Sequence, residues 1–178
     1  MAETGTPAPE ISTPRLTLRR VTPQDSGPIT EAVNDPRVYR MLARVPAGQT
    51  KAQTLAWIAT HDRGRSEDIN HVFAVVKDGT FAGVTGAHRA APDMPFEIGY
   101  WMVPAFWGQG LCTEAGAGLI GWLENRKGAA ALVSGYFADN PASGRILRKL
   151  AFLPCGRGPV VSAGRGEAAD HIHMVRVG

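Results

Sequence analysis

The sequence predicts an α/β fold in which one mixed sheet of about six or seven strands is flanked by about four helices. The first observation is the apolar and aromatic run 98–103, which is followed by a glycine-containing loop and then by apolar residues at helical spacing. The second is a pair of strand-like runs, 72–76 and 81–87, separated by an Asp-Gly turn that strongly indicates a hairpin. We therefore expect the helices to pack against a single sheet.

The length and composition of the chain limit its class. With 178 residues, one domain is expected, spanning 13–178 after a flexible tail over 1–12. Two cysteines are too few for a disulfide framework and lack metal-ligand spacing, which fits a reducing compartment. No apolar run reaches membrane-spanning length, and no signal-peptide pattern is present. We therefore expect a soluble cytoplasmic protein with no membrane partner.

The charge distribution argues for a small anionic ligand rather than for nucleic acid. The net charge of +3 gives a mildly favourable field for a polyphosphate. The densest basic group near the start is Arg15, Arg19 and Arg20. Strand alternation places the first two on one face and the third on the other, so we expect these side chains to be solvated.

The first part of the chain predicts one strand and two helices. Residues 15–21 alternate as a half-buried strand, and Thr22 followed by Pro23 is typical of a helix start. This helix should end near residue 34, because the residue before Pro36 is forced out of the α region. A second helix is expected over 50–63, with its buried side formed by Leu55, Trp57 and Ile58.

The middle of the chain continues the sheet and crosses over. A strand over 95–103 should extend the hairpin into an antiparallel meander. The helix over 110–126 contains Gly116, Gly118 and Gly121, each of which costs about 1 kcal/mol relative to alanine, so we expect close packing of this helix on the sheet. The strand over 130–137 should then run parallel to the strand before the helix.

The last part of the chain predicts a helix and two strands. Asn140 as N-cap and Pro141 at the first helical position open a helix that extends to about residue 150. Residues 155–169 are rich in glycine and proline and should form a strand and a mobile hairpin loop, before an alternating strand over 171–177. His171 and His173 share one face of that strand, but no third ligand is spaced with them, so no metal site is predicted.

The loop Gly108-Gln109-Gly110 is the main candidate for ligand binding. Glycines allow close approach of a ligand to the backbone, and the free N–H groups of the first helical turn attract anions. The loop could therefore hold a phosphate or pyrophosphate, although an ordinary tight turn would look the same. It lacks both the Rossmann pattern and the Lys-Ser/Thr of a nucleotide P-loop.

Four segments resemble a known family. Residues 97–101 (EIGYW) and 107–115 (WGQGLCTEA) are similar to the acetyl-coenzyme A loop of the GNAT superfamily of N-acetyltransferases, and the RimJ/RimL branch is the most similar. The segment 34–42 (NDPRVYRML) with Trp57, and the segment 140–152, extend the resemblance. Three positions depart from the pattern: Cys112 replaces a smaller residue, Ala151 replaces glycine, and Leu147 stands where many members have a tyrosine.

The resemblance implies a GNAT-type sheet, mostly antiparallel and splayed, that binds acetyl-CoA as cosubstrate and needs no metal. The linker over 34–50 and the C-terminal loop would select the acceptor. The cofactor would contact the main chain of Met102 and Val103, the loop and first helical turn at Trp107, Gly108, Gln109, Gly110, Leu111, Cys112 and Thr113, and the side chain of Asn140.

Direct acyl transfer to an amine needs an unprotonated amine, an oriented thioester and a proton for the leaving thiolate. Glu97 is the candidate base, acting directly or through water, and Ser143 is the candidate proton donor. A surface carboxylate and a residue of a first helical turn would explain these two equally well. Cys112 as a covalent nucleophile conflicts with direct transfer.

The acceptor is predicted to be a primary amine, and a protein or peptide N-terminus is favoured. An α-amino group has a pKa of about 7.7–8.0 and lysine one of about 10.4, so a site without a strong base suits the former. A small-molecule amine such as an aminoglycoside or polyamine is the alternative within enzymes. A non-catalytic acyl-CoA-binding module is the alternative outside them, and a homodimer remains open.

Overall fold

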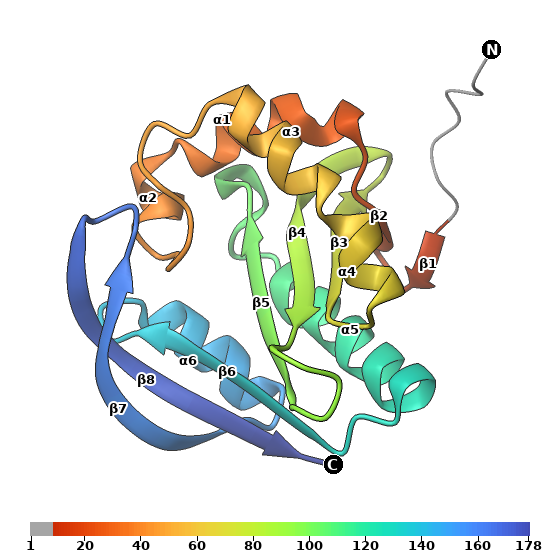
Figure 1. Cartoon of the computed structure of the whole chain (residues 1–178), viewed down its shortest axis with the longest axis vertical. Helices are drawn as coiled ribbons and strands as arrows, with labels where there is room; N and C mark the ends of the chain where they lie inside the picture. The colour runs from red at the N-terminus through yellow and green to blue at the C-terminus, as the bar shows by residue number, and fades with distance from the viewer. Residues whose placement is uncertain (1–8) are drawn as a thin grey trace.

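The computed structural model describes residues 9–178, and its strands form one sheet. The strands are β1 (Pro9–Ser12), β2 (Thr17–Arg20), β3 (Asn70–Lys77), β4 (Thr80–His88), β5 (Phe96–Met102), β6 (Ala131–Phe137), β7 (Leu153–Ser162) and β8 (Glu167–Val177). Their order across the eight-stranded sheet is β1-β2-β3-β4-β5-β6-β8-β7 (Figure 1). Every neighbouring pair is antiparallel except β5 and β6, so the predicted mixed, mostly antiparallel sheet is confirmed.

The helices follow the predicted order but are divided more finely. They are α1 (Ser26–Val33), α2 (Pro36–Tyr39), α3 (Lys51–Ala59), α4 (His61–Ser66), α5 (Leu111–Lys127) and α6 (Pro141–Lys149), with 3₁₀ turns η1 (Pro23–Asp25) and η2 (Pro104–Phe106). The predicted starts at Thr22-Pro23 and Asn140-Pro141 are confirmed. The helix expected over 50–63 is instead two helices, α3 and α4.

The N-terminal end differs from the prediction. The expected tail ran to residue 12, but Pro9–Ser12 forms strand β1 and pairs with β2 at the edge of the sheet. This additional strand raises the number of strands above the six or seven expected. Residues 1–8 of the predicted tail lie outside the described residues.

The sheet has a hydrophobic core on each face. Alternation along β3 sends Phe73 and Val75 to the core that includes residues of α5 and α6, and Val72 and Ala74 to the core that includes residues of α1 and α3. Figure 1 shows α5 and α6 behind the strands in this view. Within residues 9–178, no helix combines the length and apolarity that a membrane crossing requires.

The C-terminal region is more regular than expected. Strands β7 and β8 form a long hairpin, and only residues 163–166 make its turn, where a mobile loop was predicted. Strand β8 lies between β6 and the edge strand β7. The hairpin tip approaches α2 (Figure 1).

Candidate active site

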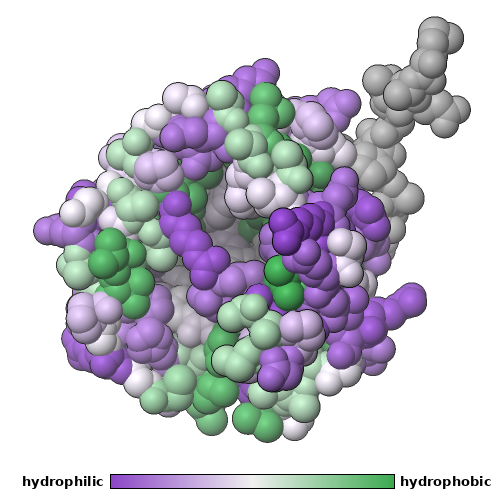
Figure 2. All heavy atoms as spheres, viewed as in Figure 1, coloured by the Kyte–Doolittle hydropathy of each residue, from purple (hydrophilic) through white to green (hydrophobic). Residues whose placement is uncertain are grey.

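A cavity of about 520 Å³ opens where β5 and β6 separate. These strands pair only at Phe96–Leu132 and Glu97–Val133, and then diverge. At the point of divergence, the buried hydroxyl of Ser134 donates to the Ile98 carbonyl at 2.9 Å, which replaces a strand-to-strand bond. Figure 2 shows this face of the molecule hollowed near its middle. The cavity wall combines α2, the linker after it, β5, the glycine loop, the start of α5, β6, α6 and β8.

The glycine loop forms an open cradle at one end of the cavity. Gly108 and Gly110 adopt left-handed φ angles of 74° and 73°. A Cβ at Gly108 would meet nothing within 4 Å, and one at Gly110 only the Arg15 guanidinium at 3.7 Å. The first main-chain bond of α5 joins the Glu114 N–H to the Gly110 carbonyl at 3.1 Å. The N–H groups before it have no partner within the helix, and no side chain caps this end, so the cradle fits an anion.

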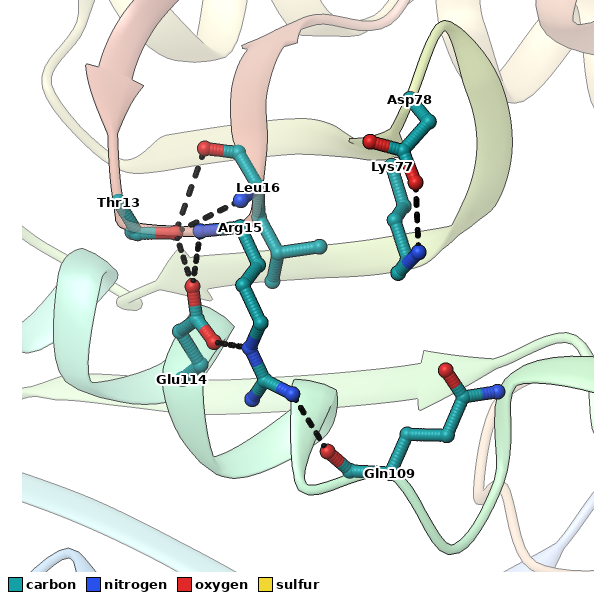
Figure 3. A network of polar contacts seen from close by, with 7 residues as sticks. All are labelled: Thr13, Arg15, Leu16, Lys77, Asp78, Gln109 and Glu114. Atoms are coloured by element: carbon teal, nitrogen blue, oxygen red, sulfur yellow. Dashed lines mark hydrogen bonds and ion pairs between the residues drawn. The ribbon is translucent and has the colours of Figure 1, made fainter.

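An ion pair between Arg15, in the connection from β1 to β2, and Glu114 of α5 supports the loop from outside (Figure 3). The Arg15 guanidinium donates to the Glu114 carboxylate at 2.6 Å and to the Gln109 carbonyl at 2.9 Å. The same carboxylate accepts from the Thr13 hydroxyl at 2.7 Å. The Arg15 side chain is 48% exposed, so the expectation that it is solvated is confirmed although it is paired. The same expectation was wrong for Arg19, which is only 12% exposed because it pairs with the buried Asp25 at 2.7 Å.

The end of β5 offers main-chain donors, although not at both predicted residues. The Val103 N–H is bonded to the Ala82 carbonyl at 2.9 Å, and its carbonyl accepts from Phe106 at 2.9 Å. Both main-chain groups of Val103 are therefore already bonded within the protein, and Val103 does not line the cavity. Strand alternation instead turns the N–H groups of Tyr100 and Met102 toward the gap, where β6 no longer pairs.

Some of the remaining loop residues line the cavity, and others hold the loop in place through hydrogen bonds. Leu111, Cys112 and Thr113 line the cavity, whereas the Gln109 side chain donates to the Ala105 carbonyl at 3.3 Å. The Trp107 indole donates to the Met102 carbonyl at 2.8 Å and lies under the Arg37 guanidinium, whose centre is 5.6 Å from the ring. Burial raises the pKa of the Cys112 thiol to about 12. A thiol so rarely ionised is a poor nucleophile.

Helix α6 places two predicted residues on the opposite wall. The Asn140 side-chain oxygen accepts from the Ser143 N–H at 3.3 Å and caps the helix, while its amide nitrogen makes no bond to a described residue. The Ser143 hydroxyl lies 3.1 Å from the Tyr100 hydroxyl, which bridges the gap from β5. Burial raises the pKa of Tyr100 above its ordinary value, so the phenol stays protonated. Leu147, where the family resemblance placed a tyrosine, is fully buried.

Glu97 lies at the other end of the cavity, on the opposite face of β5 from Tyr100. Its carboxylate is 3.0 Å from the His88 imidazole and 3.6 Å from the Arg44 guanidinium. The hydrogen bond with His88, followed by the charges of His88, Arg44 and His171, lowers the pKa of Glu97. Its side chain is 50% exposed, so solvent reaches it. The carboxylate stays ionised but is a weak base.

The α2–α3 linker and the tip of the β7–β8 hairpin close over this end. The Ser162 hydroxyl donates to the Leu42 carbonyl at 3.0 Å, and the Ala163 N–H donates to the Ala43 carbonyl at 2.8 Å. The Arg165 guanidinium donates to the Arg40 carbonyl at 2.6 Å. The two segments named as acceptor-selecting thus contact each other. We call this pair of segments, 40–45 and 162–166, the roof.

Several cavity residues were not identified from the sequence, among them Tyr100, Arg37 and His171. Tyr100 could have been found from the alternation along β5, which places it on the same face as Ile98. Arg37 and His171 line the cavity through the packing of distant segments, which no local pattern reveals. His171 and His173 lie close together, but the described residues contain no metal-type cluster of three or more ligands.

Comparisons with known proteins agree with this geometry. Residues 15–153 match the family model described as an acetyltransferase (GNAT) domain. The uncharacterized N-acetyltransferase YoaA of Bacillus subtilis (strain 168) is 28% identical over 151 residues, which are 81% of this chain and 82% of that protein.

Solved structures show the same fold at low sequence identity. RimL, a ribosomal L7/L12 alpha-N-protein acetyltransferase in complex with coenzyme A, superposes with a TM-score of 0.81 at 19% identity, over 93% of this chain and 95% of that one. Mycobacterium smegmatis RimJ in complex with CoA-disulfide gives 0.78 at 16% identity, over 91% and 81%. The microcin C7 self immunity acetyltransferase MccE, in complex with acetyl-CoA and AMP, gives 0.78 at 17% identity, over 92% and 93%.

The family match spans most of the chain, and the strand gap, the glycine cradle and the RimL/RimJ-like fold agree with it. The chain therefore belongs to the GNAT acetyltransferase family and is an acetyl-CoA-dependent acyltransferase.

Proposed function

We propose that this protein acetylates the α-amino group at the N-terminus of a protein or peptide. The observation that supports this best is the acceptor end of the cavity, where the lining carboxylate, Glu97, has a lowered pKa. A weak base suits an α-amine, which is substantially unprotonated near neutral pH, better than a lysine. RimL, whose fold is similar, is described as an alpha-N-protein acetyltransferase. Residues 9–178 would act as one acetyltransferase domain.

The cofactor would lie along the gap between β5 and β6. The cradle at Gly108 and Gly110, with the first-turn N–H groups of α5, would hold its pyrophosphate. Arg37, Arg145 and Lys149 line the same cavity and supply positive charge. The free amide nitrogen of Asn140 and the N–H groups of Tyr100 and Met102 face the gap and would bond the pantetheine arm. The full set proposed is Met102, Trp107, Gly108, Gln109, Gly110, Leu111, Cys112, Thr113 and Asn140, with Trp107 and Gln109 contributing through support of the loop.

The proposed catalytic residues lie on opposite sides of this path. Acetyl-CoA supplies the thioester-bound acetyl group and a thiolate that must be protonated as it leaves. Ser143 would donate that proton, and the protonated Tyr100 phenol 3.1 Å away can replace it. Glu97 would present a fixed negative charge to the acceptor amine. Alignment of the two reactants can account for about 7–11 kcal/mol of the barrier.

Thiol release with a panel of amines tests the acceptor. Peptides with a free N-terminus and no lysine should be acetylated, while the same peptides with a blocked N-terminus and one lysine should react far more slowly. Polyamines and aminoglycosides form the third group, because a small-molecule acceptor is the alternative. Faster turnover of these compounds than of every peptide would contradict the proposal.

Calorimetric titration with acetyl-CoA tests the cradle separately. Gly110→Val places a branched side chain where phosphate oxygens would approach and should weaken binding about tenfold or more. Gly128→Val is a matched control, because Gly128 at the other end of α5 has a similar φ of 62° and open space around it. Equal losses of affinity in the two variants would mean that backbone strain, not the cradle, is responsible.

A further inference from the structure

His171 lines the cavity and is a titratable side chain for which the proposed mechanism has not yet given a role. It is on β8, paired with Phe137 of β6, and its side chain is on the same sheet face as Gly135 and Glu97. It lines the cavity together with Glu97. This face is opposite the one that presents Tyr100 and Ser143, so the two ends of the reaction would be served from opposite sides of the sheet.

The imidazole is held in a fixed position. A Cβ at Gly135 would lie 2.2 Å from Cε1 of His171, so only a glycine at this β6 position leaves room for the ring. The ring also meets Phe137 edge-on, with centroids 5.3 Å apart. The His171 ring therefore packs tightly against Gly135 and forms part of the cavity wall.

The two ring nitrogens differ in access. Nδ1 is buried and has no hydrogen-bond partner among the described residues, whereas Nε2, which is also unbonded, is not buried. A neutral imidazole holds one hydrogen, so a ring that accepts a proton at Nε2 carries its hydrogen on Nδ1. Proton uptake at Nε2 then places a charge on a partly buried ring, which burial disfavours, so the free imidazole is kept neutral. Burial and then the charge of His173 lower the pKa of His171, while the charges of Glu97 and Asp170 oppose this. Arg44 pairs with Glu97, and Arg157 pairs with Asp170. These positive charges weaken the effect that the two carboxylates have on the pKa of His171.

We propose that His171 is a further catalytic residue, whose Nε2 takes the proton released by the acceptor amine. The amine nitrogen bonds to the acetyl carbon, the carbon–sulfur bond breaks with its electron pair remaining on sulfur, and the nitrogen loses its proton to Nε2. The thiolate is then protonated from the Ser143 side. Glu97, too weak a base to keep the proton, stabilises the imidazolium by its charge. This role rests on the proposed transfer to an amine and not on which amine is used.

The test combines NMR titration with pH–rate profiles. The Cε1–H resonance of His171, assigned by triple-resonance experiments on the wild-type protein, gives the pKa of the ring without any cosubstrate. For an α-amine acceptor, log kcat/KM should fall with a slope of about one below pH 8, from the amine, and about two below the pKa of His171. His171→Gln should lose about 10²–10⁴-fold in kcat/KM and keep the shallower slope.

His173→Gln is the matched control, because His173 is on the same face of β8 but does not line the cavity. It should keep turnover within about threefold and move the second bend to higher pH, since the His173 charge lowers the pKa of His171. Wild-type rates in His171→Gln, or a second bend in the wild type that does not match the NMR pKa, would overturn the proposal. The NMR comparison uses only the wild-type fold, so it decides the case even if His171→Gln does not fold. If only small-molecule amines are acetylated, the α-amine proposal fails, and the same comparison is made with those amines.

Discussion

Ala151 has a left-handed backbone, with φ of 62°, directly after helix α6. The Phe152 N–H reaches back to the Leu147 carbonyl at 3.0 Å, a bond that ends a helix in this way. Glycine is the usual residue in this conformation because it has no Cβ to clash. The family resemblance also placed a glycine here. The alanine at this position therefore holds a backbone conformation that is strained for any residue with a Cβ.

Ala151→Gly should relieve this strain. We expect the free energy of unfolding to rise by about 0.5–1 kcal/mol, because the loss of strain exceeds the entropy that glycine adds to the unfolded chain. Urea unfolding followed by circular dichroism measures the change. A lower stability of the variant would show that the methyl group makes packing contacts that outweigh the strain.

Local pattern explains which site residues could be predicted. The glycine loop, Asn140 and Ser143 follow from turn and helix-start chemistry, which depends on residues within a few positions. Arg15 and His171 could not be found in this way. Arg15 contacts Gln109 and Glu114, and His171 lies against Gly135 of another strand, so their roles depend on pairings across the whole chain.

In helix α5, too, the contacts that decide a residue's role come from distant parts of the chain. A Cβ at Gly116 would lie 2.7 Å from Leu150 Cδ1, and one at Gly118 would lie 2.9 Å from Thr13 Cγ2. Gly118, which also approaches Ile11 of β1 and Leu18 of β2, supports the prediction of close packing on the sheet, whereas Gly116 allows close packing against the end of α6. Gly121 has nothing within 4 Å, so the same reason does not apply to it.

Alanine substitutions should therefore have opposite effects along α5. Gly121→Ala should stabilise the protein by up to about 1 kcal/mol, through helix propensity alone. Gly118→Ala should destabilise it, because overpacking against β1 and β2 typically costs about 1–3 kcal/mol. Chemical denaturation of both variants provides the comparison, and a shift in the same direction for both would contradict the packing explanation.

The elements that were predicted incorrectly depend on partners rather than on propensity. Strand β1 begins with a proline in a stretch that looks like a tail, and it is ordered through its pairing with β2 and its contact with α5. Similarly, β7 and β8 extend well into the Gly- and Pro-rich segment because each supplies the other's hydrogen bonds. Propensity is a weak guide where a neighbouring strand decides the structure.

At the scale of the whole molecule, buried histidines make stability depend on pH. Burial lowers the pKa of His61 to about 4, and neither of its ring nitrogens has a hydrogen-bond partner among the described residues. The pKa of His71 and of His171 is lowered as well, with burial again the largest cause. A histidine with a lowered folded pKa binds fewer protons in the folded state, so stability is present above the unfolded pKa of about 6.5 and is lost as the pH falls toward the folded value.

The free energy of unfolding should accordingly decrease between pH 7 and pH 4.5, and His61 alone should contribute about 2 kcal/mol of that decrease. In His61→Leu the decrease should be smaller by about this amount, because the leucine cannot take up a proton. Guanidinium unfolding of the parent and the variant at both pH values measures the difference. Identical decreases in the free energy of unfolding of the two proteins would show that the His61 ring is exposed to solvent or makes a hydrogen bond.

The position of β8 inside the sheet affects the order in which the protein can be assembled. Strand β8 follows the other seven strands of the described sheet along the chain, yet it lies between β6 and β7, and it contributes His171 to the cavity and part of the hairpin tip to the roof. During translation, the glycine loop and α6 leave the ribosome before it does, so the cofactor half can form while the acceptor half is still absent. We infer that the nascent enzyme acquires its proposed cofactor site first and its proposed acceptor site only after residues 162–177 have been synthesised.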